Sequence, residues 1–224
     1  MSKAGYRAVV GLAVVLLSGA LPWTATPARA DAQAQGQPAA AADPYVVKGF
    51  RSAVFGTDEA TVRAAIKKDF GSAKVTLDHH PTEKTTILSV KATDLLPDTG
   101  SAQVFYTLGY KSKKLDQVNV VWGPKIDAKS NLDALVSIAN QFVSYFSGFG
   151  WQADGKVVNG RLPNGMVLAF RGYDASGRMV AVLLSPGAKD KSGNAQNDIP
   201  PQLTLTYVLD PKNPDVYKID SGAF

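Results

Sequence analysis

The sequence predicts an α+β fold, mostly antiparallel sheet with two main helices. Residues 57–70 and 131–147 each carry apolar side chains at helical spacing behind a capping residue. Short alternating or β-branched runs, separated by turn residues, surround both segments. The order of a helix and then several strands, met twice, suggests a duplicated unit with halves 45–126 and 127–224. The alternative is two similar hairpins in unrelated places.

The first expected helix, residues 57–70, has Thr57 as its N-cap and Gly71 as its C-terminal stop. Asp58 and Glu59 fall in the first turn, where the helix dipole favours acidic side chains. Four residues at helical spacing form its apolar face: Val62, Ala65, Ile66 and Phe70.

The second expected helix, residues 131–147, is capped by Ser130 or Asp127 and ended by Gly148 and Gly150. Its apolar stripe is broad and contains Leu132, Leu135, Val136, Ala139, Phe142, Val143 and Phe146.

Eight strands are expected around these helices. They cover residues 73–77, 85–95, 102–110, 115–122, 156–158, 166–171, 178–184 and 203–209. Turn residues separate them at positions 98–100, 111–114, 159–160, 164–165 and 175–177. One detail favours duplication, because Gly109-Tyr110 and Gly172-Tyr173 each precede a polar turn and then a strand that ends near a proline.

The N-terminus has the three-part layout of a secretory signal peptide. Lys3 and Arg7 precede an apolar run over residues 8–20, and Ala28 and Ala30 form a small-x-small cleavage site. The apolar run is shorter than the roughly 20 residues that span a bilayer. We therefore expect a signal peptide over residues 1–30, a periplasmic or secreted protein, and no membrane span after cleavage.

Residues 31–44 are rich in Ala and Gln and contain no large apolar side chain, which predicts a flexible leader. Residues 45–224 then form a single α+β domain. Loss of residues 1–30 removes three basic residues and no acid, so 21 basic and 19 acidic residues remain. A nearly neutral domain has no electrostatic footprint for nucleic acid. The absence of cysteine excludes a thiol nucleophile, a thiolate metal site and a lipidated cysteine.

Residues 49–71 resemble the opening of small exported bacterial proteins of unknown function. The shared phrase, F-G-[MT]-x-E-x-x-V-x-x-A-I, is carried by Phe55, Gly56, Thr57, Glu59, Val62, Ala65 and Ile66. The chain end is similar to the same group through Tyr207, Asp210, Pro211, Pro214, Asp215 and Phe224. More distantly, a glycine and capped helix followed by strands resembles small outer-membrane assembly lipoproteins and the β-lactamase-inhibitor-like fold. This resemblance implies that the chain binds other proteins.

No local motif for catalysis or for a cofactor is present. His79 and His80 are the only histidines, and adjacent strand residues point to opposite faces. Asp78 and Glu83 are the nearest further ligands, which leaves the set short of a tight metal site. A nucleophile elbow, an S-x-x-K motif and a phosphate-binding loop are all absent. We therefore expect no catalytic residues, no metal and no cofactor.

Phe149 and Trp151 are the candidate binding residues, because they follow the second helix in a glycine-rich turn. Partly exposed aromatic side chains often anchor protein partners. The alternative is that both rings close the end of the core. The leading hypothesis is a non-enzymatic exported module that binds a protein or an envelope component. The other two hypotheses are a hydrolase of unrecognised type and a small-ligand carrier.

Overall fold

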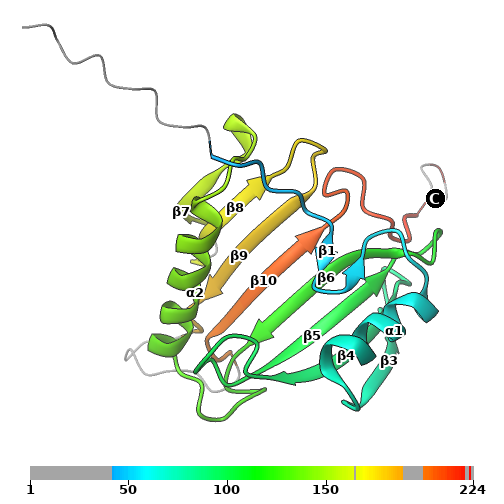
Figure 1. Cartoon of the computed structure of the whole chain (residues 1–224), viewed down its shortest axis with the longest axis horizontal. Coiled ribbons are helices and arrows are strands. Elements are labelled where there is room, and N and C mark those ends of the chain that lie inside the picture. The colour runs from blue at the N-terminus through cyan, green and yellow to red at the C-terminus, as the bar shows by residue number, and fades with distance from the viewer. Residues whose placement is uncertain (1–41, 164, 189–198, 220–221, 223–224) are drawn as a thin grey trace, which may run out of the picture. The chain divides into compact units, whose positions relative to one another are not determined.

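An eight-stranded antiparallel sheet dominates the computed structural model, which describes residues 42–163, 165–188, 199–219 and 222 (Figure 1). The expected signal peptide and residues 31–41 of the expected leader lie outside these residues, as does Asn164. Asp43 and Pro44 are already hydrogen-bonded or bridged to Gly150, so the folded part begins before the expected boundary at residue 45.

The order of elements confirms an α+β fold with two main helices. The first part contains β1 (Gly49–Phe50), β2 (Ala53–Val54), α1 (Glu59–Phe70), β3 (Val75–His79), β4 (Thr86–Thr93), β5 (Ser101–Leu108) and β6 (Leu115–Trp122). The second contains α2 (Leu132–Ser147), the short 3₁₀ helix η1 (Ala153–Gly155), β7 (Val157–Arg161), β8 (Val167–Tyr173), β9 (Met179–Ser185) and β10 (Gln202–Val208).

The topology repeats. Each half is a helix followed by four strands, and the sheet order is β3-β4-β5-β6-β10-β9-β8-β7. The last strand of one half, β6, therefore pairs antiparallel with the last strand of the other, β10. The two Gly-Tyr pairs are not equivalent in this repeat. Gly109-Tyr110 follows β5, the third strand of its half, whereas Gly172-Tyr173 ends β8, the second strand of its half.

Both helices pack on the same face of the sheet (Figure 1). Helix α2 contacts β8, β9 and β10, and the β1–β2 hairpin lies between the helices against β6 and β10. Buried strand residues alternate toward this face, as expected for Val118, Val120 and Trp122. Burial of these side chains from both layers is the main source of stability, at about 25 cal/mol per Å² of apolar surface.

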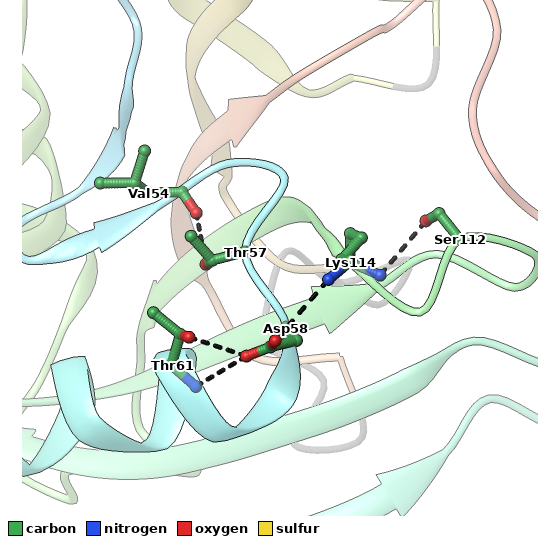
Figure 2. A network of polar contacts seen from close by, with 6 residues as sticks. All are labelled: Val54, Thr57, Asp58, Thr61, Ser112 and Lys114. Carbon is green, nitrogen blue, oxygen red and sulfur yellow. Dashed lines mark hydrogen bonds and ion pairs between the residues drawn. The ribbon is translucent and has the colours of Figure 1, made fainter.

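Helix α1 begins one residue later than the sequence predicted, because Asp58 and not Thr57 is the N-cap (Figure 2). Asp58 accepts hydrogen bonds from the Thr61 backbone N–H at 3.0 Å and the Thr61 hydroxyl at 2.7 Å. The Thr57 hydroxyl instead donates to the Val54 carbonyl at 2.7 Å. These bonds from Thr61 lower the pKa of Asp58, and Lys114 lies 3.7 Å away as a further stabilising charge. The cap thereby ties α1 to the start of β6.

Helix α2 is capped by Asn131, which accepts from the Ala134 N–H at 2.9 Å, so the expected caps Ser130 and Asp127 are wrong. Its stripe also differs in two positions. Ile138 is buried although the prediction omitted it, and Val136 is 37% exposed. Asn131 is the N-cap because its extended backbone places the side-chain oxygen over the free N–H groups of the first turn.

All strand limits agree with the prediction within two residues except the end of β7, and the shifts of β3 and β7 each have a local reason. The strand expected at 73–77 is β3, Val75–His79, because the C-cap Gly71 and the connection that follows it take up positions 71–74. Asn159-Gly160 was expected to be a turn, but both residues lie inside β7. Asn159 has a φ of +56°, so the turn-like conformation is present as an irregularity within the strand.

Candidate binding surface

The candidate binding surface is the face of the sheet opposite the two α-helices. The buried residues of both helices and of the inner strands form one core cluster on the helix side. Ala181 and Val208 are also buried but lie outside that cluster, because their side chains alternate to the other side. In the described residues, neither α-helix contributes to that second side.

We define the open face as the outward side chains of the four central strands β5, β6, β10 and β9. These are Gln103, Phe105, Thr107, Gln117, Asn119, Val121, Thr204, Thr206, Val208, Met179, Ala181 and Leu183. None of them is charged. A solvated antiparallel face usually carries polar and charged side chains, so an apolar and neutral mixture over four strands is unusual for a surface that meets only water.

The centre of the open face is a fixed polar row. Asn119 and Thr206 are directly opposite across β6 and β10, and the Thr206 hydroxyl donates to Asn119 Oδ1 at 2.9 Å. Gln117 Nε2 donates to the same oxygen at 3.0 Å. Phe105 pairs with Asn119 on the other side. Side chains already held by one another lose little conformational entropy on binding, which favours recognition.

Arg171 of β8 borders the open face beside Ala181 of β9. Its guanidinium lies 5.3 Å from the centre of the Tyr173 ring, two residues further along the same side of the strand. Arg171 Nε is buried and has no hydrogen-bond partner, and no ion pair to Arg171 occurs within the described residues. A positive group with an unsatisfied donor at the rim of a neutral face is suited to a carboxylate or a carbonyl oxygen.

Two aspartates attach the chain ends to one end of the sheet. Asp174, in the β8–β9 turn, accepts from the N–H groups of Val47, Ser176 and Arg178 at 3.0, 2.8 and 3.0 Å. The turn predicted from Ser176-Gly177 is thus confirmed, with Gly177 at a φ of +80°. These contacts hold the segment before β1 on the helix side, away from the open face.

Asp215 plays the matching part for the C-terminal segment. It accepts from the N–H groups of Lys111 at 2.9 Å and Ser112 at 2.8 Å. Burial alone would raise the pKa of Asp215, but the hydrogen bonds from Ser112 and Lys111 outweigh it and lower the pKa. Burial raises the pKa of the neighbouring Asp116, and the charges of Asp215 and Asp210 add to that rise.

A cavity of about 400 Å³ lies where the C-terminal segment crosses the β5–β6 turn. Tyr110 and Tyr217 meet edge to face in its wall, with ring centres 5.4 Å apart, and Lys111, Asp215 and Lys218 also line it. Its aspartate is already engaged by the backbone of the turn. We therefore attribute this cavity to the attachment of the C-terminal segment to the β5–β6 turn.

The structure places Phe149 and Trp151 on the helix side, at the end of α2, and not on the open face. Trp151 is half-buried, stacks on Tyr45 with ring centres 4.8 Å apart and donates from Nε1 to the Phe146 carbonyl at 2.8 Å. Its ring also rests on the backbone of Gly172. Phe149 is half-buried against Tyr45. These contacts favour the interpretation that both rings close the core, and a binding role stays a prediction.

His79 and His80 lie at the β3–β4 turn and do not converge. His79 Nδ1 is 3.4 Å from the Thr86 hydroxyl, whereas His80 Nδ1 accepts from the Glu83 N–H at 3.1 Å. Among the described residues, no three His, Asp or Glu side chains come together in a way that could hold a metal ion. Neither α-helix in the described part is long and apolar enough to cross a membrane.

Sequence reasoning missed the open face. Its residues are ordinary alternating strand residues, and only the pairing of β6 with β10 brings the two halves into one surface. The available signal was the absence of charge at alternate positions of four strands: 103, 105 and 107; 117, 119 and 121; 179, 181 and 183; and 204, 206 and 208. Comparison of the chain with family models, with curated proteins and with solved structures finds no match.

Proposed function

We propose that the chain is an exported, non-enzymatic binding module that engages a protein or another envelope component through its open face. The observation that carries this proposal is the neutral composition of that face across four central strands. The cores of protein interfaces are depleted of charged residues and retain apolar and uncharged polar side chains. The apolar side chains of the open face are half-buried or buried by their neighbours in the sheet, and an apolar patch that neither α-helix of the described residues covers is a common mark of an interaction site.

The electrostatics favour a protein over a nucleic acid. Recognition of the phosphate backbone requires several lysines or arginines aligned on one surface. The open face offers none, and each of its two borders carries one cation, Arg171 of β8 beside Ala181 and Lys91 of β4 beside Gln103. A partner that places an uncharged surface on the four central strands and one carboxylate on Arg171 would satisfy both features.

The hydrolase and carrier hypotheses have less support. A hydrolase needs convergent acid, base or nucleophile groups, and the raised pKa of Asp116 is explained by burial beside Asp215 and Asp210 at the attached C-terminal segment. A carrier needs a large apolar cavity, whereas the cavity of about 400 Å³ carries lysine, aspartate and tyrosine side chains, and a hollow of about 510 Å³ on α2 is lined mainly by polar side chains such as Asp133 and Asn140.

Site-specific photo-crosslinking in exporting cells tests the proposal. A photoreactive residue replaces Gln103 on the open face in one strain and the exposed Gln141 of α2 in another. The proposal expects one discrete adduct from position 103 and none from position 141. The same adducts from both positions, or none from position 103, would contradict it. N-terminal sequencing of the exported chain tests cleavage between Ala30 and Asp31 in the same experiment.

A further inference from the structure

The two edges of the eight-stranded sheet differ in how well they are protected. Edge strands expose unpaired N–H and C=O groups, and proteins usually disrupt them with bulges, glycine or charged residues. At the β7 edge, Asn159 has a φ of +56°, Gly160 follows it, and the pairing with β8 is interrupted at that point. The β3 edge instead keeps an unbroken register over five residues, from Val75 opposite Val90 to His79 opposite Thr86.

The hydrogen-bond pattern shows which groups of β3 point outward. The His80 N–H donates to the Thr85 carbonyl at 2.9 Å, so residues 80 and 85 form a hydrogen-bonded pair. Such pairs alternate along an antiparallel ladder, so Asp78 and Thr76 bond to β4 in the same way. The backbone groups of Val75, Leu77 and His79 therefore face away from the sheet. Leu77 is also 45% exposed, which leaves apolar surface at the same edge.

We propose that two copies of this chain associate by antiparallel pairing of their β3 strands, centred on Leu77. In this register Leu77 pairs with Leu77 of the second copy, and Val75 pairs with His79 of the second copy. Each of these pairs joins the outward backbone groups identified above, because all three residues belong to the outward set. The register therefore satisfies the free edge of both copies at once, as an isologous contact requires.

Charge complementarity selects a second copy as the occupant of this edge. On the open-face side, Thr76 comes opposite Asp78 of the second copy, and Lys74 lies diagonal to that same Asp78. Diagonal neighbours in an antiparallel pair are about 7–8 Å apart, within reach of a lysine side chain. The two-fold axis repeats the Lys74–Asp78 pair, and the like-charged Asp78 side chains of the two copies are diagonal and not directly opposite each other.

Asp78 also explains how the free edge is held in the single chain. Its Oδ1 accepts a hydrogen bond from the His79 N–H at 2.7 Å, so one outward donor is occupied by a neighbouring side chain. On pairing, the His79 N–H donates to the Val75 carbonyl of the second copy. The Asp78 carboxylate then becomes available to Lys74 of the second copy. The paired sheets would be continuous, and both open faces would lie on the same side, which allows two-point attachment to a partner.

Sedimentation analysis of the purified chain over a range of concentrations tests this proposal. We expect a weak dimer, since a five-residue strand pair is at the small end of interface sizes. Leu77→Lys places two lysines opposite each other and should weaken the dimer about tenfold or more. Val158→Lys is the matched control, because Val158 is a comparably exposed apolar residue, 41% against 45%, on the β7 edge.

A charge exchange makes the test specific for the proposed register. Lys74→Glu alone and Asp78→Lys alone should each weaken the dimer, and the double variant should restore it. A chain that stays monomeric at all concentrations would overturn the proposal, as would a dimer that Leu77→Lys leaves intact or that Val158→Lys disrupts equally. Melting temperatures of all variants show whether a loss reflects unfolding. The dimerisation result does not depend on whether position 103 crosslinks to a partner, so the two proposals can fail separately.

Discussion

The Asp174 carboxylate accepts a hydrogen bond from the Val47 N–H at 3.0 Å, across 127 residues of sequence. Asp174 is 2% exposed and also accepts from Ser176 and Arg178 of its own turn. Arg178 Nη1 donates in turn to the Val47 carbonyl at 3.1 Å. The segment before β1 is thus fixed to the β8–β9 turn from both its N–H and its C=O group.

Asp174→Asn should destabilise the chain by about 2–4 kcal/mol, because one amide group cannot accept all three hydrogen bonds and buried donors lose a charged partner. Urea unfolding measures this change. The matched control is Asp154→Asn, at an exposed position of η1, which should change stability by less than about 0.5 kcal/mol. Equal midpoints for the two variants would show that Asp174 does not hold the segment.

Gly172→Ala should be strongly destabilising, although glycine to alanine in a strand is often favourable. An added Cβ at position 172 would collide with the Trp151 ring, which is also stacked on Tyr45. Overpacking of this kind costs about 1–3 kcal/mol. Gly148→Ala is the control, since its Cβ would meet only the Tyr145 carbonyl at an ordinary 3.5 Å. Thermal unfolding should separate the two variants clearly.

Trp151→Ala should lower the melting temperature, with a loss of about 3 kcal/mol as for a large aromatic residue in a core. The contacts with Tyr45, Phe146 and Phe170 support this direction. Tyr145→Ala, at a position that is 56% exposed, should be much milder. If Trp151→Ala instead keeps its melting temperature and abolishes partner capture, the binding role suggested by the sequence would be restored.

Acid should weaken the attachment of the C-terminal segment. The pKa of Asp215 is lowered in the folded chain, so its stabilising contribution is present above the ordinary value of 3.8 and is lost as pH falls through the lowered pKa. The raised pKa of Asp116 has the opposite effect on stability. Its charged form is disfavoured in the folded chain, so Asp116 lowers the free energy of unfolding at neutral pH, and this loss disappears in acid.

Urea midpoints from neutral pH to below 3.8 test these signs. Asp215→Asn should lose stability at neutral pH and show a shallower decline in acid. Asp116→Asn should gain stability at neutral pH. If Asp215→Asn leaves the acid decline unchanged, the hydrogen bonds from Lys111 and Ser112 do not hold the segment.

Local patterns in the sequence predicted the elements well, because capping and periodicity depend on neighbouring residues. The limits of β6, Leu115–Trp122, agree with the prediction, and α1 differs only through the choice between Thr57 and Asp58 as its cap. Both residues can cap a helix, and the contacts of Asp58 with Thr61 and Lys114 decide between them only in the folded chain.

Long-range relationships could not be predicted in this way. The pairing of β6 with β10 joins residues more than 80 positions apart, as Asn119 and Thr206 show with a separation of 87. The open face exists only through that pairing. For the same reason, the similarity of Gly109-Tyr110 and Gly172-Tyr173 suggested an equivalence that the topology does not have.

The most direct test of the proposed function is the affinity of Thr204→Lys for the partner identified by crosslinking. Thr204 lies on the open face in β10, and the control Thr82→Lys adds the same charge to the exposed β3–β4 turn. We predict that Thr204→Lys weakens binding about tenfold or more, equal to about 1.4 kcal/mol, while its melting temperature and the affinity of Thr82→Lys stay unchanged. Undiminished binding by a folded Thr204→Lys would contradict the claim that the open face is the binding surface.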